Sequence, residues 1–235
     1  MTNRIEIFKN RIKKYWKRRR NTNPIKDWPA MQPFTRMGTD RGTPIDRIYI
    51  EKFLSKNKEL IKGNILEIGD AEYTFKYGKS INKSYILTVD SRDIDTSRSE
   101  YIIGDLVTGE GIPCNKIDCF ILTQTLPFIY DVKVAVKNSL KCMVKGGKIL
   151  LTVPGVTSLS PYDTPRWGHY WSFSVQSVKK LFEEAGASEI VVKSWGNPKV
   201  ASAFLYGLCA EDLIKSDFSH QDEMCPFLIT AIVTK

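Results

Sequence analysis

Carboxylates follow three short apolar runs in the first half of the sequence, and this spacing points to a nucleoside-binding site. Glu67 lies two residues before Gly69 at the end of the first run, Asp90 ends the second run roughly twenty residues later, and Asp105 follows the third. A carboxylate at Asp90 can accept hydrogen bonds from both hydroxyls of a ribose, and one at Asp105 could accept from the exocyclic amine of adenine. Gly69 would let a ligand approach the backbone closely. Each acid alone could equally be a solvated loop residue, but their common position predicts a cofactor site.

The elements that would position these acids alternate between short apolar runs and helical stretches, which is typical of a parallel sheet wound with helices. Strands are predicted at Ile65–Ile68, Tyr85–Val89, Tyr101–Ile103, Ile117–Leu122, Lys148–Val153, Glu189–Trp195 and Phe227–Thr234. Helices are predicted at Ile45–Lys62, Val132–Val144, Val175–Ala185 and Val200–Leu213, with Gly63 placed to end the first and Ser174 to cap the third. The pattern predicts an α/β domain.

This arrangement resembles the class I S-adenosylmethionine-dependent methyltransferases over about residues 41–235. The turn Lys145-Gly146-Gly147 is similar to the family's loop before strand five, and the closing segment is similar to its antiparallel last pair of strands. More narrowly, Arg41–Arg47, Thr123–Leu126 and Tyr170–Phe173 resemble a bacterial subgroup encoded beside or fused to glycosyltransferases of cell-surface polysaccharide pathways. The resemblance implies a Rossmann-like, seven-stranded, mostly parallel sheet with helices on both faces and an antiparallel last strand, preceded here by a basic N-terminal helix.

The resemblance also implies S-adenosyl-L-methionine as the cofactor. The residues it assigns to the cofactor are Glu67 and Gly69 under the methionine portion, Asp90 at the ribose, Asp105 and Leu106 at the adenine, and Gln124 beside the methyl group. The chain departs from the family at Gly69-Asp70-Ala71-Glu72-Tyr73, where members usually carry more glycines. Asp70 and Tyr73 are therefore expected to contact the cofactor through a loop that differs in detail.

Methyl transfer to a hydroxyl needs a base, because an alcohol must lose its proton when it attacks. The segment 167–171 follows the fifth predicted strand at the ligand-bearing edge and contains His169. His169 is therefore the first candidate base, and Asp163 and Asp46 are weaker candidates for the same catalytic role. His169 could instead be a lid residue that positions an aromatic wall. The aromatic residues around it could be a sugar-binding wall or hydrophobic core.

The excess of positive over negative charge lies entirely in the N-terminal segment. Residues 1–26 hold ten of the 35 Lys and Arg residues and one of the 26 acids, so this segment carries the whole formal net charge of +9. Its apolar residues recur at three- and four-residue steps, which predicts a basic amphipathic helix. We expect residues 1–26 to form an arm, 27–44 a Pro/Gly-rich connector and 45–235 the methyltransferase domain.

Three readings of the arm remain open from sequence: it could bind an anionic membrane surface, bind a protein partner such as a glycosyltransferase, or be a solvated tail. Nucleic acid is disfavoured as a partner because the remainder of the chain is electrically balanced. No apolar run approaches the roughly 18–20 residues that span a bilayer. The five cysteines contain no C-x-x-C pair, so no metal site is expected. We expect a cytoplasmic protein, peripheral at most to the inner membrane face.

Two other enzyme classes share parts of the pattern. A nicotinamide-dependent oxidoreductase would share Asp90, but the chain lacks its G-x-G-x-x-G loop. A base-modifying nucleic-acid methyltransferase would commonly carry a D/N-P-P-Y/F motif after strand four, where this chain has Thr123-Gln124-Thr125-Leu126. We therefore expect O-methylation of a sugar hydroxyl in a bacterial surface glycan or its precursor. The alternatives are a methyltransferase of another small molecule and a non-catalytic cofactor-binding module in a membrane-associated glycan assembly complex.

Overall fold

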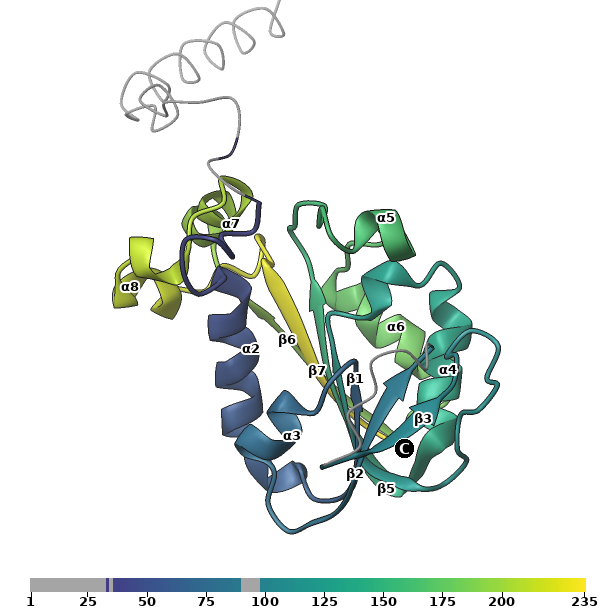
Figure 1. Ribbon diagram of the computed structural model, residues 1–235. Coiled ribbons are helices and arrows are strands. Elements are labelled where there is room, and N and C mark those ends of the chain that lie inside the picture. The colour runs from purple at the N-terminus through teal and green to yellow at the C-terminus, as the bar shows by residue number, and fades with distance from the viewer. Residues whose placement is uncertain (1–32, 34–35, 90–97) are drawn as a thin grey trace, which may run out of the picture. The chain divides into compact units, whose positions relative to one another are not determined.

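The computed structural model describes residues 33, 36–89 and 98–235, which contain a seven-stranded sheet in the order β3-β2-β1-β4-β5-β7-β6 (Figure 1). The strands are β1 (Gly63–Ile68), β2 (Ile81–Thr88), β3 (Glu100–Ile103), β4 (Ile117–Thr123), β5 (Met143–Pro154), β6 (Glu189–Trp195) and β7 (Leu228–Thr234). The first five strands pair in parallel, and β7 runs antiparallel between β5 and β6. The predicted fold class is confirmed.

Helices cover both faces of the sheet (Figure 1). One face carries α2 (Ile45–Lys56), α3 (Glu72–Tyr77) and α7 (Pro198–Leu205), and the other carries α4 (Val132–Cys142) and α6 (Val175–Ala185). The central strands of the sheet are largely buried on both sides, whereas the edge strands β3 and β6 are partly exposed. Along β4, Phe120 and Leu122 pack with α4 and α6, whereas Cys119 and Ile121 pack with α2 and α7. Alternate side chains of β4 therefore pack into the apolar cores on opposite faces of the sheet. Because both faces are buried, the sequence of β4 is almost continuously apolar.

The first predicted helix is shorter than expected. It ends at Lys56 because Asn57 leaves the helical conformation, and its side-chain Nδ2 donates to the oxygen of Phe53 at 2.8 Å. A short 3₁₀ turn, Lys58–Leu60, follows. Gly63 does not end the helix as predicted but begins β1, with a φ of +76°.

Two further helix boundaries also differ from the prediction. The helix α4 ends at Cys142 because Met143 already pairs with Ile117 as the first residue of β5. The last predicted helix, α7, ends at Leu205, and Gly207 with its φ of +71° follows it. The short helices α3, α5 (Thr164–Trp167) and α8 (Lys215–Ser219) were not predicted, because each is too short to show an apolar period.

Several sequence predictions lie outside the described residues. These are the basic arm at 1–26, residues 27–32 and 34–35 of the connector, and Asp90. By its internal contacts the chain divides into residues 1–33 and 34–235, and only the second unit is described at length. Within that described unit, no helix has the length and apolar character needed to cross a membrane.

Candidate active site

The carboxyl ends of the parallel strands place two residues with positive φ at one edge of the sheet. Gly69 follows β1 with a φ of +80°, and its N–H donates to the oxygen of Leu87 at 3.2 Å. A Cβ added to Gly69 would meet no atom within 4 Å, so the backbone here borders open space. Gln124 follows β4 with a φ of +49°, although it has a side chain. Backbone strain of this kind gathers at functional sites, and wound sheets bind ligands at this edge.

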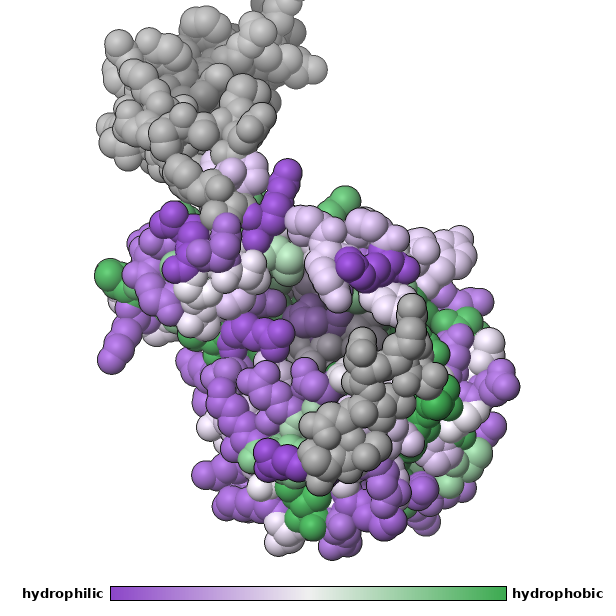
Figure 2. Space-filling view, in the orientation of Figure 1, coloured by the Kyte–Doolittle hydropathy of each residue, from purple (hydrophilic) through white to green (hydrophobic). Residues whose placement is uncertain are grey.

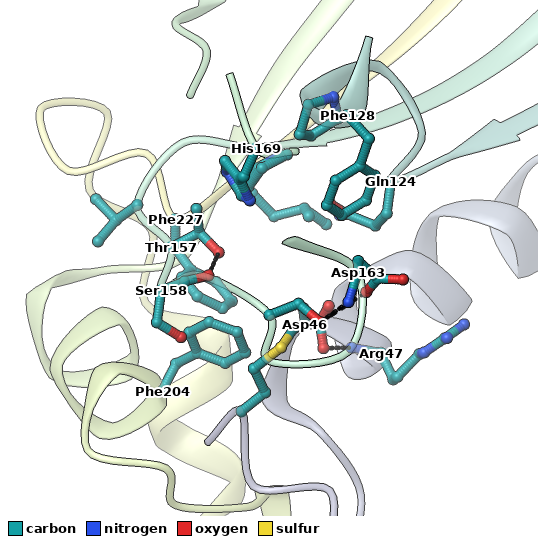
Figure 3. Close-up of a pocket in the computed structure, with 16 residues that line it drawn as sticks. Asp46, Arg47, Gln124, Phe128, Thr157, Ser158, Asp163, His169, Phe204 and Phe227 are labelled. Carbon is teal, nitrogen blue, oxygen red and sulfur yellow. Dashed lines mark hydrogen bonds between the residues drawn. The ribbon is translucent and has the colours of Figure 1, made fainter. Parts of the chain in front are cut away.

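A cavity of about 240 Å³ opens at the end of β4 and β5 and is lined by four of the predicted site residues, Asp46, Gln124, Asp163 and His169. The surface is hollowed between the parts that cover α2 and α5 (Figure 2). Asp46 comes from the first turn of α2, Gln124 from the end of β4, and the other two from the segment after β5. Figure 3 shows Asp46 and Asp163 on one side of the cavity and His169 and Gln124 on another. The fold thus brings together all three candidate bases.

The imidazole of His169 lies at the wall of this cavity. Both ring nitrogens are buried, and neither meets hydrogen-bond geometry with the described residues. Burial lowers the pKa of His169, although the nearby backbone of Trp171 and the carboxylate of Asp163 oppose this effect. The ring packs edge-on against Phe128, with 5.5 Å between the ring centroids. The lowered pKa favours the neutral imidazole, which can accept a proton from a ligand in the cavity.

The two candidate carboxylates differ in how they are held. The Oδ2 atom of Asp163 accepts a hydrogen bond from the buried Ser160 hydroxyl at 2.7 Å, which fixes it at the start of α5. The Oδ1 atom of Asp46 accepts only from the backbone N–H of Arg47, at 2.9 Å, and burial raises the pKa of Asp46. Asp163 is thus placed to stabilise a protonated His169 through its charge, and the second carboxylate oxygen of Asp46 accepts no hydrogen bond from the described residues.

Glu67 uses both carboxylate oxygens inside the protein. Its Oε1 accepts from the N–H of Tyr73 at 3.1 Å, and its Oε2 accepts from the N–H and hydroxyl of Thr74 at 2.8 and 2.7 Å. Only 2% of the side chain is exposed. Burial raises the pKa of Glu67 to about 7, despite these hydrogen bonds. The structure therefore places Glu67 as the anchor of α3, beneath the backbone that follows Gly69.

Tyr73 is also buried, and its hydroxyl accepts a hydrogen bond from the guanidinium of Arg47. This contact joins α3 to the start of α2, where Arg47 lines the cavity beside Asp46. The sequence pattern predicted no role for Arg47 itself, although Arg47 lies in the segment Arg41–Arg47 that resembles the bacterial subgroup. The structure gives Tyr73 this cross-helix contact in addition to its position in the loop after Gly69.

The remaining predicted cofactor residues lie in tight turns at the ends of β1 and β3. The Oδ1 atom of Asp70 accepts from the N–H of Glu72 at 2.9 Å, and that of Asp105 accepts from the N–H of Val107 at 2.7 Å. Leu106 is buried in the core beside α4. Each carboxylate keeps one oxygen outside these turns, whereas Leu106 presents little surface to a ligand.

Two exposed apolar residues at the cofactor edge were missed by sequence analysis. Val89 follows β2 and Ile103 ends β3, and their exposed fractions are 54% and 55%. The two strands pair with Thr88 opposite Ile103, so these side chains stand at neighbouring strand ends. The signal that could have found them is a large apolar residue at a strand end, one or two positions before an acid.

The strand order, the antiparallel β7 and the open edge after β1 define the fold of class I S-adenosylmethionine-dependent methyltransferases. No family model and no curated protein match the sequence. Among solved structures, a SAM-dependent methyltransferase from Archaeoglobus fulgidus is similar over 80% of this chain and 94% of that chain, with 13% identity and a TM-score of 0.53.

Two further solved structures are similar to the chain. Phosphoethanolamine N-methyltransferase 2 from Haemonchus contortus, in complex with S-adenosyl-L-methionine, matches over 78% of this chain and 52% of that chain, with 14% identity and a TM-score of 0.52. The [4+2]-cyclase SpnF matches over 87% of both chains, with 12% identity and a TM-score of 0.54. At these identities the likeness establishes the fold, and the SpnF example shows that the fold also supports other chemistry.

Proposed function

We propose that the protein is an S-adenosylmethionine-dependent methyltransferase that O-methylates a sugar hydroxyl of a bacterial surface glycan or its precursor. The observation that carries the proposal is the position of His169 in the cavity beside Gln124, where its two buried ring nitrogens have no hydrogen-bond partner among the described residues. A hydroxyl acceptor needs a base of this kind, because it must lose a proton. The fold and the Haemonchus enzyme's complex with S-adenosyl-L-methionine support the choice of cofactor.

The residues at the ends of β1, β2 and β3 fit the cofactor. The open space at Gly69 would admit its methionine portion against the backbone, and the exposed side chains of Val89 and Ile103 offer apolar surface to the adenine. Asp90 would accept from the ribose hydroxyls, and the free oxygen of Asp105 from the adenine amine. When bound, the cofactor supplies an electrophilic methyl group.

The chain's own residues would then deprotonate and orient the acceptor. His169 would take the hydroxyl proton on a ring nitrogen, and the carboxylate of Asp163 would stabilise the imidazolium that forms. The aromatic side chains of Phe128, Phe204 and Phe227 line the same cavity and would exclude water from it. Gln124 would orient the acceptor through its amide.

The decisive experiment is transfer of a labelled methyl group. The protein is incubated with methyl-labelled S-adenosylmethionine and with surface glycan or lipid-linked glycan precursor from bacteria that carry the gene. We expect the label in an alkali-stable methyl ether on a sugar. Label in an amine or ester would contradict O-methylation of a sugar, and binding of the cofactor without any transfer would favour the non-catalytic module.

Cofactor binding can be tested by filling the open space at Gly69. We expect Gly69→Ala to weaken binding of S-adenosylhomocysteine about tenfold or more, measured by calorimetry. Gly146→Ala is a matched control, because Gly146 also has a positive φ, +79°, and open space around its Cβ position. Gly146 lies near the start of β5, whereas the site lies at the carboxyl end of that strand. Both variants should lose similar stability from backbone strain, about 1–3 kcal/mol. Equal affinities in the two variants would refute a cofactor at Gly69.

The predicted ribose contact gives a second binding test. We expect Asp90→Ala to weaken S-adenosylmethionine binding by about 1.5–3 kcal/mol, the range for loss of a charged hydrogen-bond acceptor. Asp90→Asn should recover part of the loss, since its amide oxygen can still accept one hydrogen bond. A folded alanine variant with wild-type affinity in calorimetry would end this assignment.

A further inference from the structure

Three exposed aromatic side chains gather beside the candidate active site. Tyr130, Tyr170 and Trp171 have exposed fractions of 71%, 49% and 38%. The ring centroid of Tyr130 lies 5.4 Å from that of Tyr170 and 6.2 Å from that of Trp171. We call these three residues the aromatic platform. Burying such rings would gain free energy, and a contiguous apolar patch on a soluble domain marks an interaction site.

The platform is held in place before any ligand arrives. The indole Nε1 of Trp171 donates to the backbone oxygens of Ile129 and Tyr130 at 3.0 and 3.1 Å. The backbone N–H of Tyr170 donates to the oxygen of Pro127 at 2.8 Å. These bonds hold the indole of Trp171 and join the backbone of the segment after α5 to that of the segment after β4. A rigid platform loses little entropy on binding.

A second cavity, of about 380 Å³, lies against the platform. Tyr130 and Trp171 line it together with Asp131, Ser172 and Phe173, and α4 and α6 close its far side. The carboxylate of Asp131 forms no hydrogen bond or ion pair with the described residues and is exposed. The lining therefore combines flat apolar rings with a free acceptor and a hydroxyl.

The two cavities lie along the same pair of chain segments, which the Tyr170–Pro127 hydrogen bond and the ring contact of Phe128 with His169 hold together. Residues 124–132 supply Gln124 and Phe128 to the catalytic cavity and Tyr130 to the second, and residues 169–173 supply His169 to the first and Trp171 to the second. The catalytic cavity, at about 240 Å³, is smaller than the about 300–1,000 Å³ of a typical ligand pocket. It would hold only the reacting portion of a larger acceptor.

We propose that the aromatic platform and its cavity bind a sugar unit of an oligosaccharide, next to the unit whose hydroxyl lies at His169. This inference rests on the proposed function and extends it to an acceptor of at least two sugar units. The apolar face of a pyranose stacks on aromatic rings, and its hydroxyls can donate to the carboxylate of Asp131. A proline-rich peptide also docks on aromatic grooves, but it would leave the carboxylate of Asp131 without a donor.

The test uses Tyr130→Ala, because the Tyr130 side chain is largely exposed and forms no hydrogen bond of its own among the described residues. Purified full-length protein is titrated with maltotriose, cellotriose, mannotriose and chitotriose, and with a ten-residue proline peptide as the rival probe. The readout is the indole N–H resonance of Trp171 in ¹⁵N NMR spectra, assigned by Trp171→Phe. Tyr162→Ala is the matched control, since Tyr162 is another exposed tyrosine but lines neither cavity.

We expect at least one trisaccharide to shift the Trp171 resonance, and Tyr130→Ala to weaken that binding about tenfold while Tyr162→Ala leaves it unchanged. The inference is overturned if no trisaccharide shifts the resonance, if only the proline peptide does, or if both tyrosine variants behave alike. These outcomes are independent of the cofactor titrations with Gly69→Ala. If the protein binds S-adenosylhomocysteine but no trisaccharide, the sugar site is refuted and the cofactor site is kept. If the protein instead binds a trisaccharide but not S-adenosylhomocysteine, the sugar site is supported and the proposed methyltransferase function is refuted.

Discussion

Replacing His169 with alanine should lower the rate of methyl transfer about 10²- to 10⁴-fold, the usual contribution of a general base, and should leave S-adenosylmethionine affinity unchanged. The reason is that His169 lines the catalytic cavity and its ring nitrogens have no partner among the described residues, whereas the residues proposed to hold the methionine portion, the ribose and the adenine lie at the ends of β1, β2 and β3. The rate is measured with labelled cofactor and the acceptor that the wild-type protein methylates, and affinity is measured by calorimetry.

The other histidine of the chain provides the control. His220 is exposed at the end of α8 and does not line the cavity, so His220→Ala should keep the wild-type rate. Asp46→Asn separates the rival base: if it abolishes transfer while His169→Ala does not, the base is Asp46 and His169 is a wall residue. A near wild-type rate in His169→Ala would itself remove the histidine from the catalytic role.

The pH dependence of the rate gives a second view of the same residue. Protonation of His169 would block its action as a base, and burial lowers its pKa. The rate should therefore be retained on acidification through pH 6.5, the ordinary value for histidine, and fall only below it. Because the carboxylate of Asp163 opposes the lowering, Asp163→Asn should move the fall to still lower pH.

The sequence predicted those elements best whose ends carry strong local signals. The helix α6 has the predicted bounds, because Ser174 accepts from the N–H of Ser177 at its start and Gly186, with a φ of +91°, ends it. The short helix α3 was missed because its stability comes from elsewhere. The backbone N–H groups of its second and third residues, Tyr73 and Thr74, donate to Glu67 in the preceding strand, and no local pattern records that contact.

The candidate site could be predicted in part for a topological reason. Residues after parallel strands must meet at one edge, so the acids, Gln124 and His169 could be named from their places in the chain. What could not be predicted was the wall of the cavity, since Phe204 comes from α7 and Phe227 directly precedes β7. The internal use of both oxygens of Glu67 was equally hidden, because it depends on where α3 packs.

Glu67 should make the stability of the protein fall as the pH rises from about 4.5 to 7. Burial raises the pKa of Glu67 to about 7 in the folded state, against about 4.3–4.5 in an unfolded chain. In this window the folded state binds more protons than the unfolded state, so its free energy of unfolding decreases with pH, by about 3 kcal/mol in total. Carboxylates with a lowered pKa, such as Glu211 at about 2, have the opposite effect, and only a comparison with Glu67→Gln isolates the contribution of Glu67.

The measurement is urea unfolding of the wild-type protein and of Glu67→Gln between pH 4.5 and 7.5. Glutamine keeps an acceptor for the N–H groups of α3 but does not titrate, so the wild type should lose about 3 kcal/mol relative to this variant across the window. Glu72→Gln changes an exposed carboxylate on the same helix and should keep the wild-type profile. If the difference between the wild type and Glu67→Gln stays constant with pH, Glu67 remains ionised in the folded state. The three hydrogen bonds from Tyr73 and Thr74 would then outweigh its burial.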